Sequence, residues 1–138
     1  MTERGIFITE FDMRRLGELL QVAMLFGRNQ EIYLKALNTE LNKAQIVKPQ
    51  EVPADVVTMN SKVRVKFLTS GQSHVYTLVF PSDANIEKKC ISVLAPMGTA
   101  ILGYKVGKMV EWDAPNGHEK LVIEEIIYQP EAAGDFHL

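Results

Sequence analysis

The chain has 138 residues, 46% of them hydrophobic and 23% charged, which is typical of one compact soluble domain or of a small domain with a helical appendage. Its formal net charge of -2 gives no overall reason to bind nucleic acid, because counterion release needs clustered Lys and Arg. The single cysteine, Cys90, excludes an intrachain disulfide and a cysteine-rich metal site and indicates a reducing compartment, so we expect a cytoplasmic protein.

The first part of the chain, residues 1–47, is predicted to form an antiparallel helical hairpin. Thr9 is a candidate N-cap with Asp12 as its capping-box partner, and apolar residues then recur at steps of three and four on both sides of a corner at Gly27. They are Met13, Leu16, Leu20 and Ala23 before the corner, and Leu34, Leu37, Leu41 and Ala44 after it. Two such stripes joined by a short turn are expected to face each other. Arms of about 15 residues reach roughly 22 Å, a short projection.

The corner of the hairpin carries an arginine and two amides but no aspartate, in the sequence LFGRNQ at 25–30. Its predicted tip residues are Leu25, Phe26, Arg28 and Asn29. Apolar side chains are unusual at an exposed tip, so Leu25 and Phe26 either hold the hairpin closed or contact a partner.

The segment 48–55 has two prolines and no periodicity, and we predict a linker there. Residues 56–138 then change to the period of strands, and the pattern predicts an α+β domain, an antiparallel sheet with one helix across it. Strands are expected over 62–67, 74–80, 91–94, 109–113 and 119–128, with a helix from Pro96 to Gly103. The last two strands flank Asn116-Gly117, a strong hairpin signal.

A basic stripe follows the first of these strands. Lys62, Arg64 and Lys66 alternate with apolar residues, so they share one face of the strand at spacings of roughly 7 Å. That face could meet an acidic partner or could be an ordinary solvated sheet face, and the sequence leaves both interpretations open.

No residue pattern indicates catalysis, a metal or a cofactor. The three histidines, His74, His118 and His137, have no ligand spacing, and no nucleophile motif or phosphate-binding glycine loop occurs. Cys90 follows two lysines, which could activate its thiol, but packing is the favoured interpretation; Trp112 is expected in the core. No signal-peptide pattern and no run of roughly 18 apolar residues is present, so we expect neither export nor a membrane.

The stretch ISVLAPMGTAILGYKVGKMVEWDAPNG at 91–117 resembles the carboxy-terminal signature of Gre-type transcript cleavage factors in the order and spacing of its parts. These parts are Ala95-Pro96 at a helix start, Ala100 to Gly103 at its end, a step from Gly103 to Gly107, a strand at 109–113 and a turn at 115–117. DVVTMNSKV at 55–63 and YQPEAAGDF at 128–136 resemble the Rnk-type regulators of nucleoside diphosphate kinase, which are Gre relatives with a short amino-terminal hairpin.

This resemblance implies a coiled coil that enters the secondary channel of bacterial RNA polymerase and an FKBP-like domain that docks at the channel rim. It implies polymerase contacts at the helix start, at Ala95, Pro96, Met97 and Gly98. Ala95 departs from the family pattern, because the Ser expected there would cap the helix, and Lys108 stands where an acid is usual.

In Gre factors, acidic residues at the tip help to hold a second catalytic magnesium ion, which requires oxygen ligands. The corner here offers Arg28, which would repel the ion, and Glu31 alone is not a pair. We therefore expect a polymerase-binding regulator that is not an enzyme, does not stimulate cleavage and affects nucleoside diphosphate kinase indirectly. The alternatives are a transcript cleavage factor and a direct regulator of that kinase. Isomerase activity of an FKBP-like domain is not expected, because the helix after Pro96 supplies no aromatic side chain.

Overall fold

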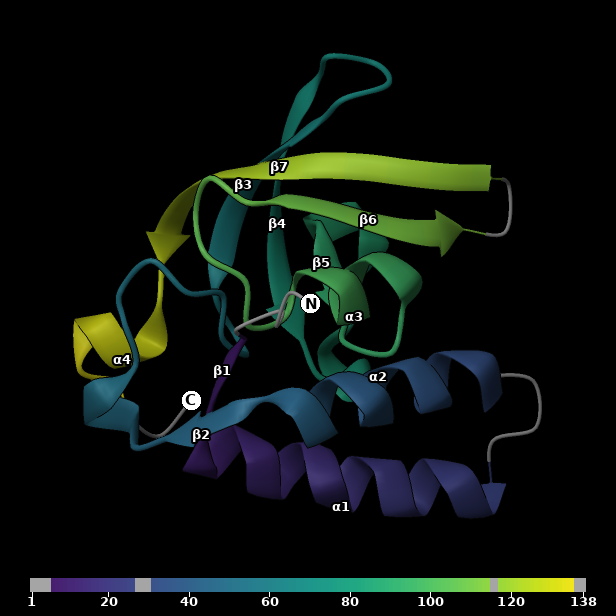
Figure 1. Ribbon diagram of the computed structural model, residues 1–138, viewed down its shortest axis with the longest axis vertical. Helices are drawn as coiled ribbons and strands as arrows, with labels where there is room; N and C mark the ends of the chain where they lie inside the picture. The colour runs from purple at the N-terminus through teal and green to yellow at the C-terminus, as the bar shows by residue number, and fades with distance from the viewer. Residues whose placement is uncertain (1–5, 27–30, 115–116, 136–138) are drawn as a thin grey trace.

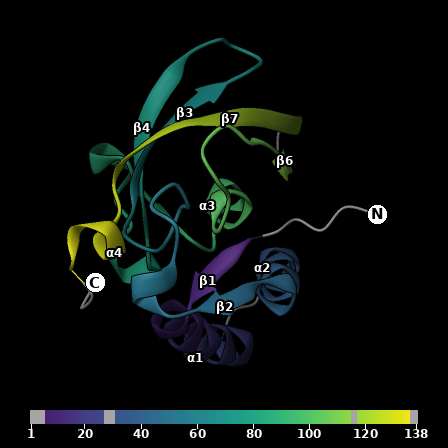
Figure 2. The same cartoon turned by 60° about the vertical axis from the view of Figure 1, so that its left-hand side comes forward.

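The structure is a computed structural model that describes residues 6–26, 31–114 and 117–135. A curved sheet forms one layer and a helical hairpin forms the other, and the short helix α3 lies between them (Figure 1). Figure 2 shows the same arrangement from another side, with α1, α2 and α3 all on one side of the sheet. The α+β architecture expected from the sequence is therefore confirmed.

The hairpin consists of α1 (Glu10–Phe26) and α2 (Glu31–Lys43), which lie side by side (Figures 1 and 2). Thr9 caps α1 as predicted, because its Oγ1 accepts a hydrogen bond from the Asp12 amide at 3.1 Å. The predicted role of Asp12 in a capping box is wrong. Its carboxylate turns instead toward Met59 and Arg15.

A short parallel pair of strands closes the base of the hairpin. β1 (Phe7–Thr9) precedes α1 and pairs with β2 (Gln45–Val47), which follows α2. This pair was not predicted from the sequence, because three residues are too few to show strand periodicity. The Phe7 amide also donates to the Gly103 carbonyl at 3.3 Å, so β1 connects the hairpin to the end of α3.

The second layer is a five-stranded sheet in the order β5-β4-β3-β7-β6. Its strands are β3 (Lys62–Phe67), β4 (Ser73–Val79), β5 (Cys90–Ser92), β6 (Met109–Ala114) and β7 (Gly117–Tyr128). Pairing is antiparallel except at one edge, where β5 runs parallel to β4 and departs from the prediction. The segment between β4 and β5 contains two 3-10 turns, Pro81–Asp83 and Ile86–Lys88. After them the chain enters β5 in the same direction as β4.

The helix α3 (Pro96–Ile101) begins at the predicted proline, and Gly103 follows its end with a φ of +83°. An ideal Cβ at Gly103 would lie 2.7 Å from the Ile6 Cβ, so the absence of a side chain allows the residue before β1 to approach closely.

The predicted linker, residues 48–55, contacts the segment that follows β7. It contains a 3-10 turn, Pro49–Glu51, and Val52 is buried. The side-chain amide of Gln129 donates hydrogen bonds to the backbone carbonyls of Pro53, at 2.8 Å, and Val56, at 2.7 Å. Gln129 also caps α4 (Pro130–Ala133), a short helix that the sequence analysis did not predict.

One hydrophobic core joins the two layers. Leu16 and Leu20 of α1 and Leu37 and Leu41 of α2 belong to the same buried cluster as residues of the sheet. The half of the hairpin nearest its base is therefore packed on the sheet layer. The proposed domain boundary within 48–55 stays a prediction.

Candidate functional site

The start of α3 is held by a tight turn that leaves β5. The Ser92 side chain accepts a hydrogen bond from the Leu94 amide, and the Ser92 carbonyl accepts one from the Ala95 amide, both at 3.0 Å. Thr99, one turn into the helix, donates its hydroxyl to the Val93 carbonyl at 2.6 Å. These three bonds fix the backbone on both sides of the helix start, so the segment presents its side chains in a defined arrangement.

Gly98 lets this turn pack directly on the helix. An ideal Cβ at Gly98 would lie 2.1 Å from the Ser92 carbonyl oxygen and 3.1 Å from the Val93 Cα. Gly98 is also buried. Of the four predicted contact residues, it therefore shapes the site from inside, whereas Ala95, Pro96 and Met97 are partly exposed and within reach of a partner.

The N-terminus of α3 has no side-chain cap. Ala95 occupies the N-cap position with extended backbone angles, φ -69° and ψ 150°, and no side chain accepts from the first turn. These angles are the ones that a capping Ser adopts.

Ala95→Ser is therefore expected to stabilise the protein by about 1 kcal/mol, because the new hydroxyl would accept a hydrogen bond from the first turn of α3. Urea denaturation followed by circular dichroism measures the change. Ala133→Ser, an exposed alanine inside α4, is the control and should give no comparable gain. A midpoint equal to that of the wild type would contradict the expected cap.

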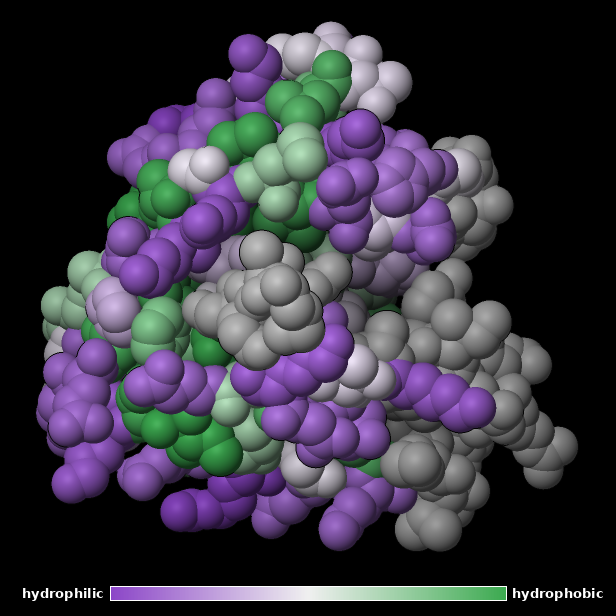
Figure 3. Space-filling view, in the orientation of Figure 1, coloured by the Kyte–Doolittle hydropathy of each residue, from purple (hydrophilic) through white to green (hydrophobic). Residues whose placement is uncertain are grey.

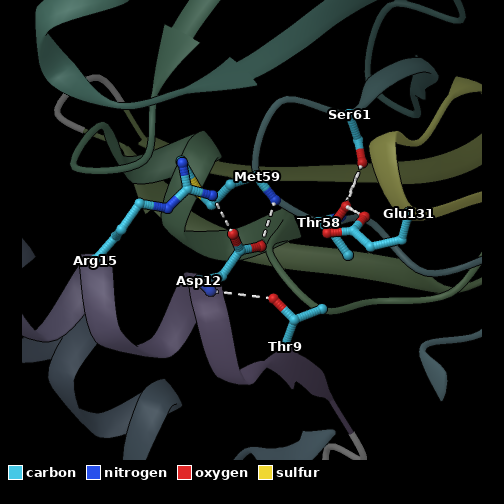
Figure 4. Close-up of polar contacts among 7 residues, drawn as sticks. All are labelled: Thr9, Asp12, Arg15, Thr58, Met59, Ser61 and Glu131. Carbon is cyan, nitrogen blue, oxygen red and sulfur yellow. Dashed lines mark hydrogen bonds and ion pairs between the residues drawn. The ribbon is translucent and has the colours of Figure 1, made fainter. Parts of the chain in front are cut away.

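A buried polar network lies where the hairpin meets the sheet layer (Figure 4). Asp12, in the first turn of α1, is 1% exposed. Its Oδ2 accepts a hydrogen bond from the Met59 amide at 3.1 Å, and its Oδ1 accepts one from the Arg15 guanidinium at 2.6 Å. Next to Met59, the Thr58 hydroxyl donates to the Glu131 carboxylate at 2.7 Å, so α1, the entry to β3 and α4 meet here.

The pKa of Asp12 is raised to about 6. Burial is the main cause, because it removes the charged carboxylate from water, and the negative charge of Glu131 adds to it. The hydrogen bonds from Arg15 and from the Met59 amide lower the pKa, but only in part.

Arg15 extends this contact through two aromatic rings. Its guanidinium carbon lies 3.9 Å from the centre of the Phe11 ring on α1 and 4.7 Å from that of Phe80, which follows β4. A cation between two ring faces is favourable, particularly where water is partly excluded. The first two turns of α1 thus contact the sheet layer through a carboxylate and a guanidinium.

Four aromatic side chains meet on the side of the sheet that carries the buried residues Val63 and Val65. They are Phe67, His74, Tyr76 and Trp112, all partly buried. Their rings meet at centroid distances of 5.7 to 6.5 Å, with Phe67 at the centre. The prediction that isomerase activity is absent considered aromatic residues only on the helix after Pro96, and this cluster, which comes from the strands, was missed. Trp112 is at the edge of the core rather than inside it.

Comparison with known families accounts for both layers. A profile described as "Transcription elongation factor, GreA/GreB, C-term" matches residues 52–128, more than half of the chain. The chain belongs to the GreA/GreB family. A second profile, described as "Rnk N-terminus", matches residues 4–47, so this GreA/GreB relative carries the hairpin of the Rnk type.

Individual relatives agree with this assignment. The chain is 41% identical, over the full length of both proteins, to the "Regulator of nucleoside diphosphate kinase" of Escherichia coli strain K12. It is 31% identical to the transcription elongation factor GreA of Helicobacter hepaticus, over 92% of this chain and 82% of that protein. A solved GreA/GreB elongation factor from Nitrosomonas europaea covers 89% of this chain and 99% of its own, with 38% identity and a TM-score of 0.74.

The predicted tip of this GreA/GreB relative is only partly placed. Arg28 and Asn29 lie outside the described residues. Leu25 and Phe26 form the last two positions of α1, and their side chains also lie outside the described part. The role of the tip stays a prediction.

The basic stripe lies on the side of β3 away from its buried residues. Lys62 and Lys66 are exposed, whereas Arg64 pairs with Glu125 of β7. Glu124 also lies nearby, where it accepts a hydrogen bond from Ser73 at 2.8 Å. Acidic neighbours therefore offset part of the positive charge, and a role of this face in binding an acidic partner stays a prediction.

His118 lies between two carboxylates on β6. Its Nδ1 is 2.9 Å from Asp113 and its Nε2 is 2.9 Å from Glu111. These hydrogen bonds raise the pKa of His118, and the bond to His118 lowers the pKa of Glu111. Within the part of the chain that the structure describes, no group of three or more His, Cys, Asp or Glu side chains is arranged to hold a metal ion.

Where Figure 3 colours the hairpin, near its base, the surface is mostly hydrophilic, and hydrophobic side chains lie near β2 and over the β3–β4 hairpin. The large apolar residues exposed in these two regions are Ile46 and Leu68. Among the described residues, no helix has both the length and the apolar character needed to cross a membrane.

Proposed function

We propose that this protein binds bacterial RNA polymerase at the secondary channel and regulates transcription without stimulating transcript cleavage. The match of residues 52–128 to the carboxy-terminal region of GreA/GreB elongation factors is the observation that carries the proposal. The sheet layer would dock at the rim of the channel, and the hairpin would enter it. Such a regulator needs no cofactor, is not an enzyme and works in the cytoplasm, where its partner is. This function requires neither binding to a membrane nor strong direct binding to nucleic acid.

The surface proposed for docking is the start of α3. Its three hydrogen bonds hold Ala95, Pro96 and Met97 in a fixed turn with their side chains partly exposed. Met97 also packs against the buried core residues, and this contact holds its side chain in place. A rigid, partly apolar surface of this kind suits a contact with another protein.

The length and charge of the hairpin support the absence of cleavage stimulation. α1 has 17 residues and α2 has 13, which correspond to roughly 25 and 20 Å. Residues 25–30 contain no carboxylate. A second magnesium ion needs hard oxygen ligands, which guanidinium cannot supply. The hairpin would therefore occupy the channel and compete with longer channel factors.

Core polymerase is expected to retain the purified protein in a pull-down at low salt, with an affinity in the micromolar range or tighter, and a cleavage factor should displace it. Met97→Glu should weaken this binding at least about tenfold, because it places a charge at the docking surface. Met109→Glu is the matched control, since Met109 is 49% exposed on β6. Absence of association at low salt would contradict the proposed function.

A backtracked elongation complex separates this function from that of a transcript cleavage factor. We expect RNA cleavage no faster than that of polymerase alone, and reduced cleavage when a Gre-type cleavage factor is also present. Faster cleavage with this protein alone would show that it is a cleavage factor.

The second candidate function is direct regulation of nucleoside diphosphate kinase, which the name of the full-length Escherichia coli relative favours. Direct regulation predicts that the two purified proteins bind each other without polymerase and that kinase activity changes on mixing. The proposed function predicts neither result, because its effect on the kinase is indirect, through transcription.

A further inference from the structure

The hairpin is held against the sheet layer by two kinds of contact. Leucines of α1 and α2, including Leu16 and Leu37, are buried in the common core. Asp12 adds a directional contact between the layers, because its carboxylate accepts a hydrogen bond from the Met59 amide at 3.1 Å. Within α1 it also bonds the Arg15 guanidinium at 2.6 Å, and that guanidinium contacts the Phe80 ring of the sheet layer. These two kinds of contact act differently on the geometry of the hairpin.

Apolar burial holds surfaces together but depends little on direction, and hydrophobic cores tolerate small shifts of their side chains. A hydrogen bond weakens steeply when its angle or length departs from a narrow range. The Met59 amide belongs to the fixed backbone that leads into β3, because the adjacent Thr58 bonds both Ser61 and Glu131. Asp12 is therefore bonded to a rigid part of the sheet layer, and a tilt of α1 would break that bond.

The position of Asp12 amplifies its effect at the other end of α1. The helix continues from Asp12 to Phe26, a distance of roughly 21 Å at 1.5 Å per residue. A tilt of about 10° at its base would displace that end by roughly 4 Å. A small tilt of α1 at Asp12 therefore produces a large displacement at the end of the hairpin that would meet a partner.

We propose that Asp12 is a positioning residue, whose carboxylate fixes the direction of the hairpin relative to the sheet layer by bonding the Met59 amide and Arg15. The effect of this direction on polymerase binding rests on the proposed function. Asp12 does not itself contact the partner in this proposal, because it is 1% exposed. Arg15 contributes through its contact with the Phe80 ring, which adds a second link to the sheet layer.

The direction of the hairpin can be measured by electron-electron double resonance between two spin labels on the full chain. Lys35 on α2 and Lys120 on β7 are exposed and suit labelling through cysteine, in a Cys90→Ser background that removes the native thiol. Asp12→Ala should shift the mean distance by up to roughly 4 Å or broaden its distribution by a similar amount, since Lys35 lies closer to the base of the hairpin than the end of α1 does. Glu18→Ala, which removes an exposed carboxylate from the same helix, should leave the distribution unchanged.

Asp12→Asn is the second variant, since it has the same shape and keeps an acceptor for the Met59 amide while losing the charge that bonds Arg15. We expect a smaller displacement than in Asp12→Ala, and this variant decides the question if Asp12→Ala does not fold. Circular dichroism shows which variants are folded. Distance distributions of the folded Asp12 variants that superimpose on that of Glu18→Ala would overturn the proposal.

Polymerase binding by the same variants tests the functional part separately. Asp12→Asn should displace a longer channel factor less effectively than the wild type, while Glu18→Ala should match the wild type. Failure of the wild type to bind polymerase would overturn the proposed function, and the label distances would still decide whether Asp12 positions the hairpin. A changed distance with unchanged displacement would show that the direction of the hairpin does not matter for binding and would overturn that part of the proposal.

Discussion

Gly98→Ala is expected to destabilise the protein by about 3 kcal/mol or more, because the added methyl group has no space. Its Cβ would lie 2.1 Å from the Ser92 carbonyl oxygen and 3.0 Å from the carbonyl carbon, and both are backbone atoms. Backbone atoms cannot rotate away as the end of a side chain can. Relief would require α3 to move from the turn after β5 and would strain the bond from Thr99 to the Val93 carbonyl.

Gly17→Ala is the matched control for this substitution. Gly17 lies within α1, and an added Cβ would meet no other atom within 4 Å. Alanine there should stabilise the helix by up to about 1 kcal/mol, because glycine has the lower helix propensity. Urea denaturation of both variants gives the two changes, which should have opposite signs. An unfolding midpoint of Gly98→Ala within error of the wild type would show that the turn adapts to the methyl group.

The same two variants bear on the docking surface. A folded fraction of Gly98→Ala should bind polymerase more weakly than Gly17→Ala, since the turn that presents Pro96 and Met97 would have moved. Gly98 was predicted as a contact residue because of its place in a family signature. In the structure it is buried and sets the shape of the turn, and its contact with a partner stays a prediction.

The elements with long, regular periodicity were predictable from the sequence. The leucine stripes of α1 and α2 and the alternation in β3 each repeat enough times to separate a period near 3.6 from a period of two. Pro96 and Gly103 likewise bound α3, because proline suits a helix start and glycine the residues just after its end.

The short elements and the long-range pairings were not predictable in this way. β1 and β2 have three residues each and α4 has four, too few to show a period. The parallel pairing of β5 depends on how the chain returns after β4, and the sequence pattern alone does not encode the direction of a three-residue strand. The aromatic cluster around Phe67 also required the register of β3 with β4, which places His74 opposite Val65 and Tyr76 opposite Val63.

Asp12 shows how one signal in the sequence supported two interpretations. It lies three residues after Thr9, which suggested a local capping contact, but it also lies four residues before Leu16 and eight before Leu20, on the buried face of α1. An acidic residue on an apolar stripe indicates a buried carboxylate with partners elsewhere in the chain. The position of Asp12 relative to the stripe could have indicated its burial, but the sequence was interpreted only as a capping box, and only the fold could supply Met59 as the partner.

The raised pKa of Asp12 predicts a specific dependence of stability on pH. The folded protein holds the Asp12 proton up to about pH 6, whereas the unfolded chain releases it near the ordinary value of 3.8. Between these values the native state binds more protons than the unfolded state, so this residue's contribution to stability falls as the pH rises. A difference of this size corresponds to roughly 3 kcal/mol, lost between about pH 4 and pH 6. Arg15 and Glu131 are the charged groups that affect Asp12, and their opposing effects are included in its pKa.

Asp12→Asn should remove this dependence, because an amide does not titrate. The free energy of unfolding of the wild type, minus that of Asp12→Asn, should therefore decrease by roughly 3 kcal/mol from about pH 4 to pH 6 and stay level above it. Taking the difference cancels the titration of the other carboxylates, which both proteins share. Glu18→Gln, at an exposed position of the same helix, should give a nearly flat difference over this range. A flat curve for Asp12→Asn as well would mean that the carboxylate stays hydrated in solution, because burial is the cause that raises its pKa.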